Sequence, residues 1–190
     1  MRSVAVYCGS SPGFRPEYSD AAQSLGAILA HRRITLVYGG GHVGLMGVIA
    51  DACLEAGGEV HGVITEALRD AEVAHPGLTR LEVVPDMHQR KERMASLADG
   101  FVAMPGGFGT WEELFEVVTW SQLGTHSKPV CLLDVLGFFD HLLAFARHAA
   151  AEGFIKDSNL DLIRVTSDAN SVLATLEVPM QPRVAKWAGR

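Results

Sequence analysis

Short apolar runs alternate along the chain with longer segments in which apolar residues recur every three or four positions. The runs cover residues 3–8, 34–38, 59–64, 100–104 and 129–134, with a further run at 162–165 and a weaker one at 81–85. Their hydrophobicity is continuous rather than alternating, which is typical of strands buried on both faces of a parallel sheet. The pattern therefore predicts six strands, and a weaker seventh, in one mainly parallel sheet.

The segments between the runs have helical periodicity. They cover residues 16–31, 43–56, 87–98, 110–123, 138–152 and 168–176. Strands that alternate with helices of this length predict an α/β fold, as a single doubly wound domain with helices on both faces of the sheet. We expect this domain to span residues 1–178. Residues 179–190 contain two prolines and three cations and are expected to form a loosely docked tail.

Two segments depart from this rhythm. Residues 65–79 are polar and irregular and follow a strand, a position at which a loop can cover a ligand. The helix at 87–98 carries four consecutive charged residues, which are Arg90, Lys91, Glu92 and Arg93. Successive helical residues lie about 100° apart, so four of them cannot share one solvent-facing stripe. At least one of Arg90 and Arg93 is therefore expected to face a pocket wall.

The composition excludes several classes of protein. The 190 residues are 48% hydrophobic with a net charge of −6 and no long basic run, which argues against disorder and against a general nucleic-acid binder. Cys8, Cys53 and Cys131 are widely spaced and odd in number, so we expect a reducing, cytoplasmic compartment rather than a disulfide framework. The histidines lack metal-ligand spacing, and neither a signal peptide nor a membrane span is indicated. We therefore expect no metal site and no membrane partner.

The first glycine-rich turn follows the run at 34–38. Gly39, Gly41 and Gly44 satisfy the pattern G-x-G-x-x-G between a strand and a helix, which is typical of dinucleotide-binding folds. No acidic residue clearly ends the next run to bind a ribose. The turn can therefore contact a ligand, through Gly41, Gly44 or Met46, or simply allow close packing of helix on sheet. Ser10, after the first run, is a further candidate contact.

The second glycine-rich turn reads P-G-G-F-G-T at residues 105–110. It follows the run at 100–104 and leads into the helix expected from Thr110. Glycines here let backbone N–H groups converge on an anion at a helix N-terminus. Thr110 can cap this helix, and Glu113 then stands at the N3 position of a capping box. Glu113 is therefore either a structural cap or a catalytic carboxylate.

Both turns follow a strand and precede a helix, so they meet at one edge of the predicted sheet. This is the edge at which open α/β sheets bind ligands. A nucleoside monophosphate suits such a site, with one turn holding the phosphate and the other close to the sugar or base.

Two motifs together resemble the signature of a known family. Residues 90–94 match R-K-x-x-M and residues 105–113 match P-G-G-x-G-T-x-x-E, which are motifs of the Lonely Guy (LOG) family of cytokinin riboside 5′-monophosphate phosphoribohydrolases. The resemblance extends to C-G-S-S at 8–11, to Y-G-G-G at 38–41 with G-L-M-G at 44–47, and to residues 116–124. It covers about residues 4–176, nearly the whole predicted domain.

The resemblance implies a Rossmann-like fold, a homodimer, and hydrolysis of the N-glycosidic bond of an N6-modified AMP to the free base and ribose 5-phosphate, without a cofactor. The family's catalytic residues fall on Arg90 and Glu113. Its substrate contacts fall on Glu72, Lys91, Gly107, Phe108, Gly109, Thr110, Trp111, Glu112 and Thr119. Many such sequences bear the label of lysine decarboxylase, but no lysine here stands in a recognisable context for a pyridoxal phosphate Schiff base.

The chemistry of this reaction suits the two residues. Cleavage builds positive charge on the ribose, which a carboxylate such as Glu113 can stabilise while it binds hydroxyls or activates water. It also builds negative charge on the base, which a cation such as Arg90 can stabilise, or Arg90 can hold the substrate. Direct attack by water is favoured because no second acid is evident. Two alternatives stay open, a broader AMP or purine nucleotide nucleosidase and a mononucleotide-binding protein without turnover.

Overall fold

The computed structural model describes residues 1–71 and 73–179, so all but the first residue of the tail expected at 179–190 lies outside the described residues. Seven strands form one sheet in the order β4-β3-β2-β1-β5-β6-β7, and every neighbouring pair is parallel. The strands are β1 (Ser3–Tyr7), β2 (Thr35–Tyr38), β3 (Val60–Thr65), β4 (Arg80–Val84), β5 (Gly100–Ala103), β6 (Val130–Leu133) and β7 (Ile163–Thr166). The predicted parallel α/β fold is confirmed, and the weakest predicted strand forms the edge of the sheet as β4.

Helices connect the strands, and six of them correspond to the predicted periodic segments. These are α1 (Pro16–His31), α2 (Gly44–Glu55), α4 (Met87–Leu97), α5 (Phe108–Leu123), α6 (Asp140–Ala151) and α8 (Val172–Glu177). Two short helices, α3 (Glu66–Asp70) and α7 (Asp157–Leu160), were not predicted because each is too short to show a helical period. No helix within residues 1–71 and 73–179 is long and apolar enough to cross a membrane.

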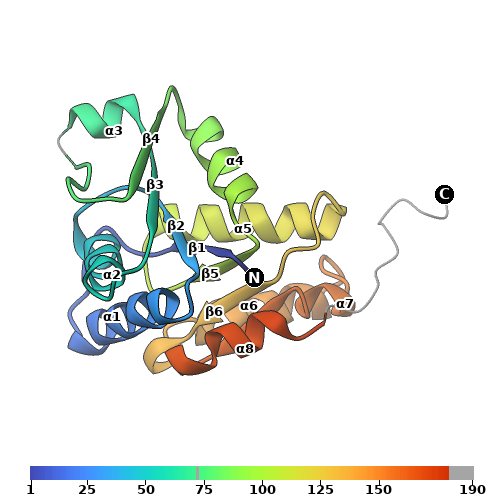
Figure 1. Ribbon diagram of the computed structural model, residues 1–190. Coiled ribbons are helices and arrows are strands. Elements are labelled where there is room, and N and C mark those ends of the chain that lie inside the picture. Colours follow the sequence, from blue (N-terminus) through green and yellow to red (C-terminus); the bar gives the residue numbers. More distant parts are fainter. Residues whose placement is uncertain (72, 180–190) are drawn as a thin grey trace.

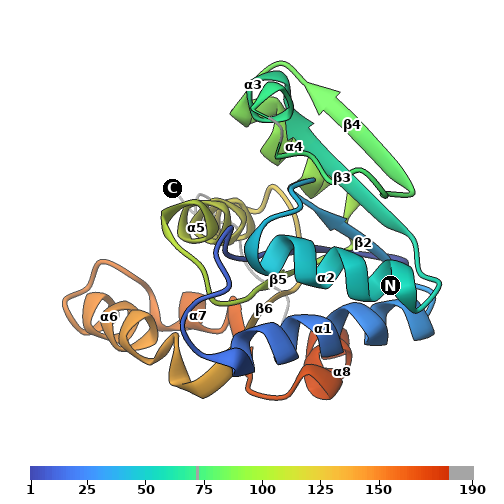
Figure 2. The same ribbon diagram turned by 90° about the vertical axis from the view of Figure 1, so that its left-hand side faces the viewer.

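The sheet has a separate apolar core on each face, because alternate residues of one strand point to opposite sides. Val4 and Val6 of β1 pack with α1, α2 and α8, whereas Ala5 and Tyr7 pack with α4 and α5. Figures 1 and 2 show these two groups of helices on opposite faces of the twisted sheet. The doubly wound arrangement leaves the carboxyl ends of the strands as the edge at which the βα turns gather.

The strand order reverses next to β1, and open α/β sheets bind their ligands at the carboxyl edge beside such a reversal. From β1 the chain proceeds to β2 on one side, while β5 lies on the other side. The turns that follow these strands are tied together there. The Gly9 N–H donates to the carbonyl of Pro105 at 3.0 Å, and the Leu45 N–H donates to the carbonyl of Gly9 at 3.0 Å. Both glycine-rich turns therefore meet at the turn after β1, as the sequence predicts.

Gly44 of the first turn is fixed by backbone geometry and by space. Its φ is +59°, in the left-handed region, and a Cβ added there would overlap the backbone of Ser10. Gly124, which caps α5, also has a positive φ of +82°. A Cβ added to Gly124, however, would meet no atom within 4 Å. The two glycines therefore separate backbone strain from close packing.

We predict that Gly44→Ala lowers the free energy of unfolding by about 2–5 kcal/mol, because strain and overlap add. Gly124→Ala, the matched control, should cost only about 1–2 kcal/mol because strain acts alone. Urea unfolding of both variants measures the difference. Equal losses would show that the contact between Gly44 and Ser10 contributes nothing.

Candidate active site

Arg90 is buried at the carboxyl edge of the sheet, although it belongs to a helix rich in charge. Asp86 caps α4 by accepting the Gln89 N–H at 2.9 Å, and Arg90 lies one turn further on. Its Nε donates to the carbonyl of Val63 at 3.0 Å, and its Nη2 donates to the carbonyl of Gly39 at 3.2 Å. The guanidinium is thereby held across the ends of β3 and β2. We expected at least one of Arg90 and Arg93 to face a pocket wall. Arg90 is the buried one, whereas Arg93 pairs with Glu82.

The first glycine-rich turn makes room for this guanidinium. A Cβ added to Gly39 would overlap the Nη2 atom of Arg90, so a larger residue there would push the guanidinium out of this position. The side chain of Met46 packs beside the same point and also lies against Gly41. Gly41 is buried, and its carbonyl accepts the hydroxyl of Tyr38 at 3.1 Å. In this structure, Gly39 and Gly44 therefore serve close packing, which is one of the two roles that the sequence left open for the turn.

Glu113 faces Arg90 from α5. The expected helix start at Thr110 is wrong, because α5 begins at Phe108 with Gly107 as its N-cap. Thr110 is then the third helical residue and makes no capping bond, and Glu113 lies beyond the first turn. Glu113 is therefore not part of a capping box. Its Oε1 lies 3.7 Å from Nη1 of Arg90, and the two side chains are only 11% and 9% exposed.

Burial sets the charge state of Glu113. It raises the pKa of this carboxyl to about 7, even though the Arg90 cation works in the opposite direction. Tyr7 and Cys8 at the end of β1 lie close enough for the Glu113 charge to act on them, and burial together with that charge raises the pKa of both groups. A carboxyl that titrates near neutral pH in a crevice is typical of a functional site.

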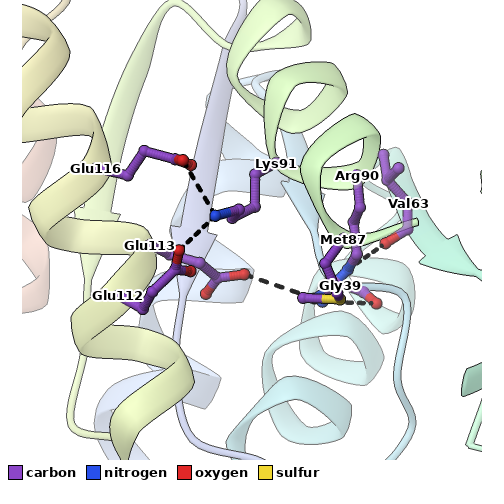
Figure 3. A network of polar contacts seen from close by, with 8 residues as sticks. All are labelled: Gly39, Val63, Met87, Arg90, Lys91, Glu112, Glu113 and Glu116. Atoms are coloured by element: carbon purple, nitrogen blue, oxygen red, sulfur yellow. Dashed lines mark hydrogen bonds and ion pairs between the residues drawn. The ribbon is translucent and has the colours of Figure 1, made fainter.

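Lys91 forms a second polar cluster beside this pair (Figure 3). Its Nζ donates to the carboxylate of Glu112 and, at 3.0 Å, to Oε1 of Glu116. Burial disfavours the charge on Lys91, but the two carboxylates outweigh burial and raise its pKa. Glu116 was not among the residues predicted from the sequence. Its position four residues after Glu112 places both on one face of a helix, but this spacing does not show that Lys91 lies opposite them.

The second glycine-rich turn is open toward solvent at the start of α5. Gly107, Phe108 and Gly109 are exposed, and a Cβ added at Gly107 or Gly109 would meet no atom within 4 Å. The first N–H groups of a helix have no acceptor within it, so this turn offers free donors beside the buried pair. Thr110 is buried with its Oγ1 against Gly106, and Ser10 is exposed on the adjacent turn.

Three of the remaining predicted residues, Phe108, Trp111 and Thr119, belong to α5. The rings of Phe108 and Trp111 meet edge to face with centroids 5.2 Å apart, and Phe108 is 85% exposed. Thr119 is exposed on α5, three residues beyond Glu116, and its side chain makes no hydrogen bond within the described part of the chain. Glu72 lies outside the described residues. In the regions that the structure covers, no three His, Cys, Asp or Glu side chains are grouped to hold a metal ion.

Comparison with known proteins places the chain among close relatives. The family described as "Possible lysine decarboxylase" matches residues 46–176. A cytokinin riboside 5′-monophosphate phosphoribohydrolase of Rhodococcoides fascians is 48% identical over 94% of this chain and 90% of its own length. One of Arabidopsis thaliana is 46% identical over 97% of this chain and 88% of its own length. A probable phosphoribohydrolase of the same name from Oryza sativa subsp. japonica is 49% identical over 92% and 78%, respectively.

Solved structures share the fold at lower identity. The structure of TM1055 has a TM-score of 0.73 at 23% identity and covers 93% of this chain and 99% of its own. The molybdenum cofactor binding protein from Rippkaea orientalis has a TM-score of 0.70 at 20% identity, over 92% and 94% of the two chains. At such identities the likeness concerns the Rossmann-like architecture alone. The matches in sequence, by contrast, extend over nearly the whole chain, and they show that it belongs to the Lonely Guy family of cytokinin riboside 5′-monophosphate phosphoribohydrolases.

Proposed function

We propose that this protein is an enzyme that hydrolyses the N-glycosidic bond of a cytokinin riboside 5′-monophosphate, an N6-modified AMP. The products are the free base and ribose 5-phosphate. One observation carries the proposal: a buried arginine and a buried carboxyl, Arg90 and Glu113, face each other directly beside an open glycine-rich helix N-terminus. The relatives that carry this activity in their names support the same reaction.

Glu113 acts on the sugar in this proposal. Above pH 7 it is a carboxylate, because its pKa lies near that value. As the bond from the anomeric carbon to the base nitrogen breaks, its electron pair leaves with the base and positive charge builds on the ribose. The carboxylate stabilises that charge, or it takes the proton of the water whose oxygen bonds to the anomeric carbon. Either role needs the ionised form.

Arg90 acts as a fixed cation. Hydrogen bonds to the carbonyls of Val63 and Gly39 hold its guanidinium, so it cannot follow a substrate far from this position. Its charge favours ionisation of Glu113 and is available to the departing base or to the substrate phosphate. A buried guanidinium that needs no rearrangement is suited to stabilise charge that appears only during the reaction.

The open turn supplies the phosphate site. We assign the phosphate to the backbone N–H groups of Gly107, Phe108 and Gly109 and to the hydroxyl of Thr110, at the start of α5, where the helix dipole favours an anion. The other substrate contacts that we propose are Lys91, Trp111, Glu112 and Thr119, together with Glu72, which lies outside the described residues. Ser10, Gly41, Gly44 and Met46 are further candidates.

The two alternatives differ from this proposal in testable ways. A broader AMP or purine nucleotide nucleosidase would use the same residues on an unmodified base. A protein that only binds a mononucleotide would gain nothing from a buried carboxyl that is costly to ionise at neutral pH. Release of free base from isopentenyladenosine 5′-monophosphate and from AMP, followed by chromatography, separates all three functions.

We also propose a single domain over residues 1–178, a cytoplasmic location and a homodimer built on α4 and α5. The free thiols of Cys8, Cys53 and Cys131 support a reducing compartment. Met94 of α4 and Leu114 and Val117 of α5 are buried within one chain, so these apolar residues are not available to a dimer interface. Phe115 and Leu123 stay exposed for a second copy to cover.

Glu113→Gln should move activity and stability in opposite directions. Turnover should fall by about 10²–10³ or more, because the neutral amide neither stabilises the ribose cation nor activates water. The pKa of Glu113 is raised by folding from 4.5 to about 7, so the folded state loses stability as pH rises through this interval. At pH 8 the neutral variant should therefore be more stable than the wild type by up to about 3 kcal/mol in the free energy of unfolding. Its melting temperature should be correspondingly higher. At pH 4.5 the two proteins should be equally stable.

Base release and thermal melting at the two pH values test this prediction. Glu66→Gln, on the exposed face of α3, is the control and should change neither quantity. Turnover near that of the wild type in Glu113→Gln would remove Glu113 from the chemistry.

The 5′-phosphate should be essential for efficient turnover. Isopentenyladenosine lacks the phosphate and cannot accept hydrogen bonds from the N-terminus of α5. Because hydrogen bonds to a charged group are lost, its kcat/KM should be at least about a hundredfold lower than that of its 5′-monophosphate. Steady-state kinetics on the two compounds measures this ratio. Comparable values would mean that the turn at 107–110 does not hold a phosphate.

A further inference from the structure

We propose that Glu116 is a positioning residue, which fixes the amine of Lys91 between α4 and α5 and thereby frees Glu112 for the substrate. The inference rests on the proposed function, in which Lys91 and Glu112 contact the substrate. Glu116 itself is assigned no contact with the substrate.

The geometry makes Glu116 the inner partner of Lys91. Its Oε1 lies 3.0 Å from Nζ of Lys91, and its side chain is 23% exposed. Glu112, one turn earlier on α5, bonds the same amine but is 54% exposed. Figure 3 shows Lys91 reaching from α4 to the two carboxylates, with Glu113 beside them. The amine therefore has one sheltered anchor and one partner at the solvent side.

Burial of Lys91 explains why two partners are needed. The side chain is only 8% exposed, and a buried ammonium left without a counter-charge is strongly destabilising. If Glu112 were the sole partner, it could not turn to a substrate hydroxyl or base without leaving that charge unpaired. With Glu116 in place, Glu112 can exchange Lys91 for the substrate while the amine stays in position.

Glu116 also belongs to the set of charges that act on Glu113. The groups that act on this carboxyl are Arg90 and Lys91 of α4, Glu112 and Glu116 of α5, Tyr7 of β1 and Cys8 directly after it. The negative charge of Glu116 favours the protonated form of Glu113. Loss of this charge should therefore lower the pKa of Glu113 and move the acid limb of the kcat/KM profile to lower pH.

The competing explanation is that Glu116 only stabilises the packing of α4 and has no effect on the substrate. A second glutamate that binds α4 serves as a matched control. Glu82 on β4 accepts a hydrogen bond from Nε of Arg93 on α4 at 2.7 Å, and its side chain is 25% exposed. Glu82 thus anchors the same helix with a similar exposure, but on its other side. Glu82→Gln should reduce stability and leave the kinetics unchanged.

The test compares Glu116→Ala, Glu116→Gln and Glu82→Gln in the full chain with isopentenyladenosine 5′-monophosphate. Glu116→Ala should raise KM by about ten- to a hundredfold, the effect of a lost hydrogen bond to a charged group, with a smaller change in kcat. Glu116→Gln keeps an acceptor for Lys91, so its KM should rise less, while its acid limb should still move to lower pH. If Glu116→Ala does not fold, Glu116→Gln carries the test.

A second readout does not depend on turnover. Reductive methylation followed by mass spectrometry reports how accessible each amine is, with exposed Lys156 as the internal reference. Lys91 should react slowly in the wild type and in Glu82→Gln, and faster in the Glu116 variants. Unchanged Lys91 reactivity, or kinetics of the Glu116 variants equal to those of Glu82→Gln, would overturn the positioning role. A wild type without base release would instead refute the proposed function, and the methylation result would still decide the role of Glu116.

Discussion

The burial of the Arg90 guanidinium at the carboxyl edge of the sheet is the constraint on which the site depends. Its desolvation is compensated by the carbonyls of Val63 and Gly39 and by the carboxyl of Glu113. Each partner imposes a requirement on the chain. A side chain at position 39 would displace the guanidinium, and α4 must place Arg90 within reach of the carbonyls of Gly39 and Val63. The helix α5 must also start early enough to bring Glu113 opposite the guanidinium.

The same arrangement makes the site costly to the fold and useful for chemistry. Glu113 sits where its ionisation is disfavoured by burial and favoured by Arg90, and the balance leaves its pKa near neutral pH. The adjacent cluster of Lys91, Glu112 and Glu116 adds one cation and two anions without burying an unpaired charge. A carboxylate that water solvates poorly interacts strongly with charge that develops on a bound sugar. The fold is therefore destabilised at the position where the proposed reaction needs a poorly solvated carboxylate.

The sequence predicted the sheet well because strands buried on both faces leave continuous apolar runs, as at 100–104 and 129–134. It also predicted that Arg90 or Arg93 turns inward, because helical geometry allows no other arrangement of four consecutive charges. The start of α5 was misplaced by two residues, since threonine and glycine cap helices about equally well and local preference does not separate Thr110 from Gly107. Glu116 was missed because its role depends on the distance between two helices, which no local pattern records. The open or packed character of each glycine likewise depends on neighbours from other turns.

Burial raises the pKa of Glu113, and the Arg90 cation limits this rise so that the pKa lies at about 7. Carbon-13 NMR of glutamate labelled at the side-chain carboxyl, with Glu113→Gln to assign the resonance, measures this directly. In the wild type the Glu113 signal should titrate with a midpoint near pH 7, and in Arg90→Gln, where the favourable cation is absent, the midpoint should move to higher pH. A midpoint near 4.5 in both proteins would show that Glu113 behaves as an ordinary exposed carboxyl and would contradict the account.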